Sequence, residues 1–259
     1  MKEHETRTYA RREQTMKNHR YTRAEWARAL VKGVALALGI VFAGAGCDDL
    51  LDVEPPDLIP AAGLAVPENA ELLVNGAIGD FECAFGAYVA LTGVMAQEVI
   101  DATQTAARWP YDRRNLTSQD ALYGTFGCTG LGVYTPLSTA RFSADDILNH
   151  LQGWTDAQVE GRQALIAKAA AYSGYAHLLM GEAFCSVAID LSPELSSQDV
   201  FQRAVDRFDT ALTAAQASGD QDLVNFARVG RARAYLALGQ ESSALADAQQ
   251  VPADFEYVA

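Results

Sequence analysis

The chain has 259 residues, with 20 Lys and Arg against 33 Asp and Glu and a formal net charge of −13 at pH 7. Nine of the basic residues but only four of the acidic residues precede Cys47, so the rest of the chain carries 11 basic and 29 acidic residues and a net charge of −18. This acidity argues against a nucleic-acid partner, because nucleic-acid binding depends on Lys and Arg that neutralise phosphates. It also argues against a polybasic contact with a membrane surface.

Residues 1–46 predict the signal peptide of a lipoprotein. A basic segment leads into 14 uncharged residues, 33–46, and Cys47 follows directly. A basic segment, a short apolar segment and small residues before the cut are typical of an export signal. The cysteine after Ala45 and Gly46 resembles a bacterial lipobox, which implies cleavage before Cys47 and lipidation of its thiol. The alternative is a transmembrane anchor, which is less favoured because a bilayer span needs about 20 apolar residues.

Residues 47–67 predict an acidic, proline-rich tether, since proline disfavours helix and favours extended chain. Apolar residues recur at helical spacing from about Glu68, so we expect one helical domain over 68–259. The segments Ser143–Asp146 and Thr155–Gln158 resemble capping boxes, which predicts that helices begin there. Further helices are expected near 198–217, 221–238 and 241–250. The predicted fold class is all-α.

Residues 101–135 differ from the rest, because they are rich in glycine and aromatic residues and predict a long irregular region. Trp109, Tyr111 and Arg113 in this region are the ligand-binding candidates. A sugar ring has an apolar C–H face and a hydroxyl edge, which a flat aromatic ring and nearby polar groups can match. The alternative is that Trp109 packs the irregular region onto the helices.

Three cysteines follow Cys47 and allow at most one internal disulfide outside the cytoplasm. The predicted pair is Cys128–Cys185. Cys128 lies in a glycine-rich loop that can adjust its backbone, and Cys185 lies where a predicted helix ends. Cys83 lies within a predicted helix and is expected to be a buried free thiol.

No catalytic motif appears in the sequence, so neither an enzyme nor a cofactor is expected. His150 and His177 are the only histidines after the leader, which argues against a metal site. Asp145 and Asp146 form a carboxylate pair, for which capping of a helix N-terminus is the favoured role. Arg231 and Arg233 are candidates for binding an anion, although ion pairs with an acidic surface are favoured.

Residues from about 156 to 251 predict tetratricopeptide repeats. Ala232, Tyr235 and Ala244 fall at the small and large positions of such a repeat. The preceding helical pair fits more loosely, because its loop is too long for the standard repeat. Two repeats need other helices to cover their ends.

The order of these segments resembles the SusD/RagB-like outer-membrane nutrient-binding lipoproteins. The matching segments are 47–56, 71–79, 136–145, 164–184, 200–211 and 230–239. The resemblance implies a lipid-anchored protein of the outer membrane, on the cell surface or the periplasmic face. It implies capture of glycan or other nutrient oligomers for a TonB-dependent transporter. Family members are commonly longer, so it also implies a fragment or a natural truncation.

The alternative function is a lipid-anchored tetratricopeptide scaffold. Such a protein would bind an envelope protein or peptide in the concave groove of its repeats. Both functions are non-enzymatic and require no nucleic acid.

Overall fold

The structure is a computed structural model that describes residues 61–103, 105–117, 119–120 and 132–258. Within these residues the fold is all-α, as predicted. The helices are α3 (Ala61–Leu64), α4 (Ala70–Met95), α5 (Trp109–Asp112), α6 (Tyr134–Gly153), α7 (Arg162–Ala183), α8 (Ser197–Ser218), α9 (Gln221–Ala237) and α10 (Glu241–Ala248). The predicted signal peptide, Cys47 and the tether as far as residue 60 lie outside the described residues.

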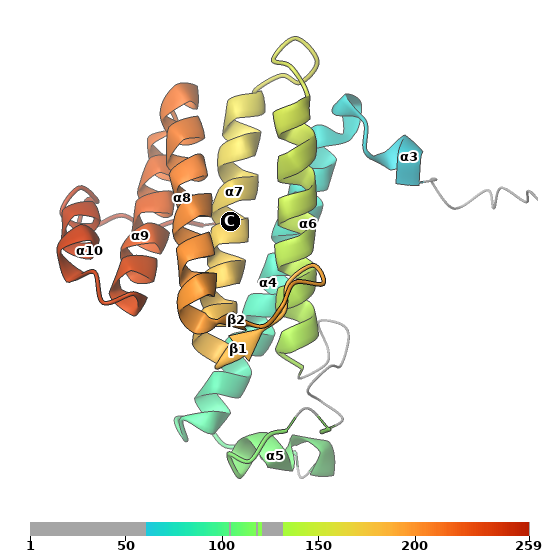
Figure 1. Cartoon of the computed structure of the whole chain (residues 1–259), viewed down its shortest axis with the longest axis vertical. Helices are drawn as coiled ribbons and strands as arrows, with labels where there is room; N and C mark the ends of the chain where they lie inside the picture. The colour runs from blue at the N-terminus through green and yellow to red at the C-terminus, as the bar shows by residue number, and fades with distance from the viewer. Residues whose placement is uncertain (1–60, 104, 118, 121–131, 259) are drawn as a thin grey trace, which may run out of the picture. The chain divides into compact units, whose positions relative to one another are not determined.

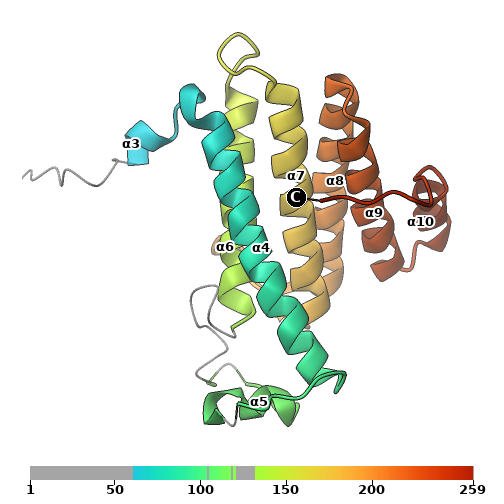
Figure 2. The same cartoon turned by 180° about the vertical axis from the view of Figure 1, so that it is seen from behind.

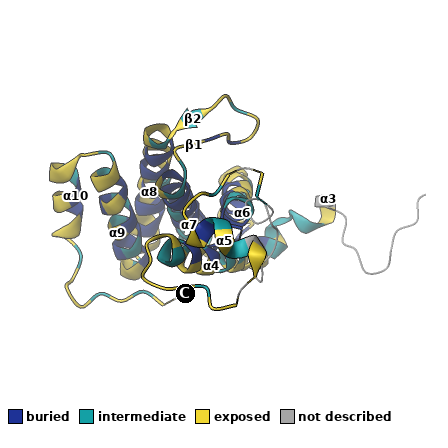
Figure 3. Ribbon diagram, turned by 90° about the horizontal axis from the view of Figure 1, so that it is seen from below, coloured by how far each residue is buried: buried dark blue, intermediate teal, exposed yellow. Residues whose placement is uncertain are grey.

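Helix α7 is the centre of the helical domain. It lies between α6 and α8 (Figure 1) and also contacts α4 and α9. Helix α4 crosses α6 and α7 on the side that faces the viewer in Figure 2, and α5 lies at its C-terminal end. Helices α9 and α10 continue the row beyond α8, and α10 is mostly exposed (Figure 3).

The helices of the predicted repeats begin and end close to where the sequence indicates. Ser196 and Asp199 form a capping box at the start of α8, and Gly219 ends that helix in the left-handed conformation with φ of 75°. Asp220 then caps α9 by accepting from the backbone N–H of Leu223 at 3.0 Å. The predicted small residues Ala232 and Ala244 are both buried.

Two predicted helix starts are wrong. Helix α6 begins at Tyr134, nine residues before Ser143, with Pro136 in its first turn, where the missing N–H costs nothing. The Ser143 hydroxyl therefore caps no helix and instead donates to Asp80 at 2.6 Å. Gln158 does accept from the backbone N–H and hydroxyl of Thr155, both at 2.9 Å. However, residues 155–161 form turns and no helix, Gly161 is left-handed with φ of 63°, and α7 begins only at Arg162.

The side chain of Phe208 fixes the packing of three helices. It is fully buried on α8, with a glycine of each neighbouring helix against its ring. A Cβ added at Gly174 of α7 would lie 2.8 Å from the ring, and one added at Gly230 of α9 would lie 2.3 Å from it. Both helices therefore approach α8 closely because these residues lack side chains.

Helix α4 is less buried than the other long helices, α6, α7, α8 and α9. Val74, Ala77, Phe81 and Ala84 form its buried stripe against α6 and α7. The segment Pro67–Met95 is long and apolar enough to cross a membrane by length and composition, and it is the one such helix among the described residues. Only 28 % of that apolar window is buried, so the described residues leave much of α4 half-buried or exposed.

Helices α7 and α8 are joined by a two-stranded antiparallel ribbon of β1 (Ser186–Val187) and β2 (Leu195–Ser196). At its tip, Asp190 and Leu191 have φ of 51° and 61°. The Ser192 N–H donates to the Ile189 carbonyl at 2.9 Å, which closes a turn of the type I′ class. The leucine is thus held in a conformation that L-residues disfavour, and its side chain is fully exposed.

Candidate functional site

The three predicted ligand-binding residues lie on or next to α5 but face different surroundings. Trp109 is 43 % exposed, and the guanidinium carbon of Arg113 lies 4.7 Å from the centre of its indole ring. This is a cation–π distance, so the two side chains form one surface feature. Tyr111 is only 2 % exposed and packs with the core beside α4. The structure therefore brings Trp109 and Arg113 together and places Tyr111 behind them.

A pocket of about 360 Å³ opens between the end of α4 and α5. Its apolar wall comes from α4 and the following segment, and Tyr111 closes one side. The lining residues are Ala90, Leu91, Val94, Val99, Ile100, Asp101, Arg108 and Tyr111. The pocket is thus mostly apolar with one carboxylate and one guanidinium, a composition that suits a ligand with an apolar face and a few polar groups.

Asp101 is the polar residue of this pocket with unused hydrogen-bonding capacity. Its Oδ1 accepts from the backbone N–H of Thr103 at 2.9 Å and from the Thr103 hydroxyl at 2.6 Å, and Arg108 lies 3.5 Å away. The hydrogen bonds from Thr103, with a smaller contribution from Arg108, lower the pKa of Asp101 and keep it ionised. Its Oδ2 is buried and has no hydrogen-bond partner among the described residues.

Sequence reasoning missed Asp101 and Arg108. The pattern Asp-x-Thr around Asp101 is a local turn signal, and Arg108 directly precedes the predicted Trp109. Neither pattern indicates that the end of α4 packs against α5, which is a tertiary contact. The pocket therefore becomes visible only in the fold.

A serine, a histidine and an aspartate also meet in the core, but not in a catalytic arrangement. The Ser173 hydroxyl donates to Asp145 Oδ1 at 2.6 Å, and Arg207 Nε donates to the same oxygen at 2.7 Å. His177 Nδ1 lies 2.9 Å from the Ser173 carbonyl oxygen, which can only accept, so Nδ1 carries the proton. A nucleophilic serine would donate its hydroxyl proton to the imidazole, whereas the Ser173 hydroxyl donates to the aspartate.

Burial governs the charges of this cluster. It lowers the pKa of His177 to about 4, so the imidazole is neutral at pH 7. Burial acts in the opposite direction on Asp145, but the interactions with His177, Ser173 and Arg207 prevail and lower its pKa. The predicted capping role of Asp145 and Asp146 is wrong, because both lie in the middle of α6. Asp145 instead links α6 to α7 and α8.

Arg231 and Arg233 form ion pairs, as the sequence analysis favoured over anion binding. Arg231 donates to both carboxylate oxygens of Asp247, at 2.6 and 2.7 Å, and to Asp209 at 2.6 Å. Arg233 donates to both carboxylate oxygens of Glu182, at 2.6 and 2.9 Å. These bidentate pairs join α9 to α10, α8 and α7, so neither arginine is left for an anion.

The predicted Cys128–Cys185 disulfide is wrong. Cys185 is a free, exposed thiol directly before β1, whereas Cys83 on α4 is disulfide-bonded to a partner outside the described residues. Cys83 is half-buried and is not the buried free thiol expected from its position within a helix. Cys128 lies outside the described residues.

Within the described ranges, no group of three or more His, Cys, Asp and Glu side chains is arranged to hold a metal ion. A scan of the chain against models of protein families and a search of curated proteins found no match. The pocket beside α5 therefore has to be interpreted from its own chemistry: its described lining offers apolar contact, one carboxylate and one guanidinium.

Proposed function

We propose that the chain is a non-enzymatic, lipid-anchored binding protein of the outer membrane that captures glycan or other nutrient oligomers. The observation that carries this proposal is the mostly apolar pocket beside the exposed Trp109, with Asp101 and Arg108 as the charged residues of its described lining. A carboxylate and a guanidinium in a mostly apolar pocket suit a ligand that combines an apolar face with hydroxyl groups. The indole face of Trp109 suits the C–H face of a sugar ring.

The resemblance of the sequence to SusD/RagB-like lipoproteins supports the same function and adds a partner. On this proposal a TonB-dependent transporter receives the captured oligomer, and the lipid on Cys47 keeps the protein at the membrane. The all-α fold and the packed helical pairs of the predicted repeat region agree with the resemblance without being specific to it.

Binding is tested by calorimetric titration of the full-length chain with a panel of neutral oligosaccharides. Trp109→Ala is expected to weaken binding by about 1–3 kcal/mol, the range for loss of an aromatic stacking platform. Asp101→Asn should also weaken it, because the carboxylate acceptor is replaced by an amide. The matched control is Phe142→Ala, which removes another exposed aromatic ring, on α6, outside this pocket. Equal binding by all four proteins, or none by the wild type, would refute the proposal.

The lipid anchor is tested separately. Mass spectrometry of membrane-extracted protein should show a diacylated or triacylated N-terminus on Cys47. Cys47→Ala should release the protein from the membrane fraction. A Cys47→Ala variant that is membrane-bound to the same extent as the wild type would contradict the lipid anchor. That result would not bear on the proposal that the protein binds oligosaccharides.

The alternative is a lipid-anchored scaffold that binds an envelope protein. One observation favours it: a second apolar surface lies between α3, α4 and α6, on residues that the proposed oligosaccharide site does not use. Co-purification of the protein from gently solubilised outer membranes distinguishes the two. A TonB-dependent transporter in the complex supports nutrient capture, whereas an outer-membrane assembly component supports the scaffold.

A further inference from the structure

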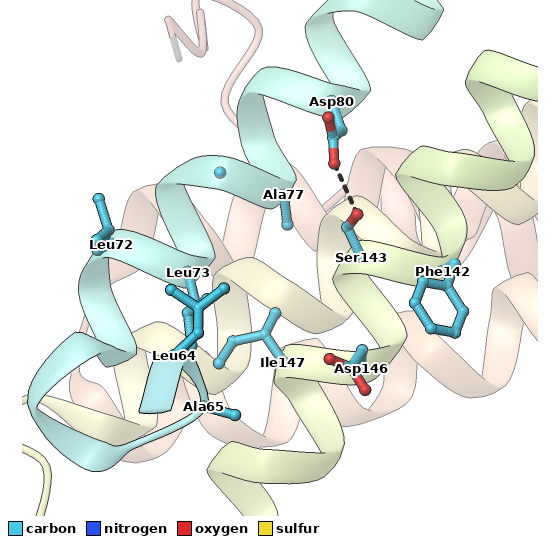
Figure 4. A pocket seen from close by; sticks show the side chains of 11 residues that line it. Leu64, Ala65, Leu72, Leu73, Ala77, Asp80, Phe142, Ser143, Asp146 and Ile147 are labelled. Carbon is cyan, nitrogen blue, oxygen red and sulfur yellow. Dashed lines mark hydrogen bonds between the residues drawn. The ribbon is translucent and has the colours of Figure 1, made fainter. Parts of the chain in front are cut away.

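A groove of about 370 Å³ lies between α3, α4 and α6, at the opposite end of α4 from the α5 pocket. In Figure 4, Leu64, Leu73 and Ile147 point into its centre, and Phe142 and Asp146 lie along the α6 side. Leu72 and Phe142 are 63 % and 56 % exposed, so its rim presents large apolar side chains to solvent. We name this surface the α4–α6 groove.

The charged residues that line the groove are all acidic. They are Asp80 on α4 and Asp146 on α6, and the described lining contains neither Lys nor Arg. Asp80 accepts one hydrogen bond, from Ser143, as the dashed line in Figure 4 shows. The side chain of Asp146 is 55 % exposed, and His150 Nε2 lies 3.8 Å from its Oδ2. The groove thus combines an apolar floor with two carboxylates that have free acceptor capacity.

Two of the α4 residues that line the groove are small. Gly76 lines it, and a Cβ added there would meet nothing within 4 Å. Ala77 beside it contributes only a methyl group. Small residues on a helix allow another backbone to come close, so an occupant can lie directly against this part of α4.

We propose that the α4–α6 groove binds a segment of a protein partner in which bulky apolar side chains are flanked by Lys or Arg. The apolar floor provides the burial, and Asp80 and Asp146 select for positive charge. The expected binding mode is that of an amphipathic helix, which lays its apolar face into a hydrophobic groove. This site is independent of the proposed oligosaccharide pocket, which has different lining residues.

The probe is a fluorescently labelled synthetic amphipathic helix with a leucine face flanked by lysines, titrated into the full-length chain by anisotropy. Two control peptides separate the contribution of charge from that of apolar burial. One replaces every lysine with glutamate, and the other replaces every leucine with glutamine. We expect the leucine–lysine peptide to bind at least about tenfold more tightly than either. Added salt should weaken its binding, because the carboxylates are exposed.

Gly76→Phe is the variant that locates the site, because the new ring fills the groove without meeting existing atoms at its Cβ. Gly86→Phe is the matched control: it replaces another α4 glycine with open space around it, outside the groove. Gly76→Phe should weaken binding at least about tenfold, whereas Gly86→Phe should leave it unchanged within about twofold. Asp146→Asn should weaken binding and reduce its salt dependence.

Three results would overturn the proposal. One is no binding of the leucine–lysine peptide by the wild-type chain. Another is equal binding by Gly76→Phe and Gly86→Phe, which would show general attraction to an acidic surface. The third is that phosphatidylcholine vesicles compete with the peptide in the wild type but not in Gly76→Phe, which would assign the groove to a lipid surface. Circular dichroism of both variants confirms that they retain the helical fold.

Discussion

Three of the four glycines of α4, at positions 76, 79 and 86, and the glycines of α7 and α9 occupy opposite environments. On α7 and α9, Gly174 and Gly230 lie against the ring of Phe208, and no side chain fits at either position. On α4, Gly76 and Gly86 have open space where a Cβ would be. One side of the domain is therefore closed by packing, whereas on the other side the described residues leave an apolar surface uncovered.

This difference separates stability from function. Residues of the α7–α9 region hold the helices together, so replacing them should lower the free energy of unfolding. Residues on the outer face of α4 contribute little packing, and exposed apolar side chains such as Leu72 and Val89 remain there at a cost in solubility. Both proposed binding surfaces, the α5 pocket and the α4–α6 groove, use α4.

The largest expected effect comes from removing a phenylalanine on the closed side. Phe208→Ala should lower the free energy of unfolding by about 4 kcal/mol, because it leaves a cavity between three helices. Phe85→Ala on α4 should lower it by about 1 kcal/mol or less, since Phe85 is 45 % exposed. Urea denaturation of both variants measures the difference. Comparable losses would show that the two regions are packed alike.

His177 should make the closed side sensitive to acid. Its pKa is about 4 in the folded chain and 6.5 without burial, so the unfolded chain binds the proton more strongly. Stability from this group is therefore complete above pH 6.5 and falls as the pH drops toward 4, by up to about 3 kcal/mol.

Replacing His177 by Asn keeps a donor for the Ser173 carbonyl and removes the titrating group. Urea denaturation between pH 4 and 7 should show a flatter stability profile for His177→Asn than for the wild type. The same series on His150→Asn, at a half-exposed position on α6, is the matched control for removing a histidine. An unchanged slope in His177→Asn would show that another group causes the acid sensitivity.

The smallest expected effect concerns the turn between β1 and β2. Leu191→Gly should raise the free energy of unfolding by about 0.5–1 kcal/mol, because it relieves the left-handed conformation and no packing is lost. The control is Leu245→Gly, at an exposed leucine within α10, which should lower stability by about 1 kcal/mol. A loss of stability in Leu191→Gly would mean that the leucine packs against the protein in solution.

The sequence predicts the fold class and the repeat helices because their signals are local. Ser196, Gly219 and Asp220 mark helix ends through contacts within a few residues. The sequence misplaces the start of α6 because Ser143–Asp146 matches a capping box. In the fold, Ser143 donates to Asp80 of α4, and Asp145 accepts from α7 and α8. A local pattern cannot distinguish a cap from a tertiary contact in such a case.

The candidate sites were only partly predictable for the same reason. Trp109 and Arg113 lie four residues apart at α5, so the sequence can suggest that they act together, whereas Asp101 comes close to them only because α4 and α5 meet. The choice of Cys185 over Cys83 rested on helix position, which does not give the distance between two thiols. In the sequence, Gly76 is an ordinary helix glycine. It lines a groove only because α6 lies beside α4 in the fold.

The most direct measurement is urea denaturation of two glycine-to-alanine variants side by side. Gly230→Ala should lower the free energy of unfolding by about 1–3 kcal/mol, because the new methyl group collides with Phe208. Gly86→Ala should raise it by about 0.5–1 kcal/mol, because alanine favours helix and meets no neighbour. Opposite signs are the result that this account predicts. A loss of stability in both variants would show that the outer face of α4 is packed, and it would contradict the division into a closed side and an open one.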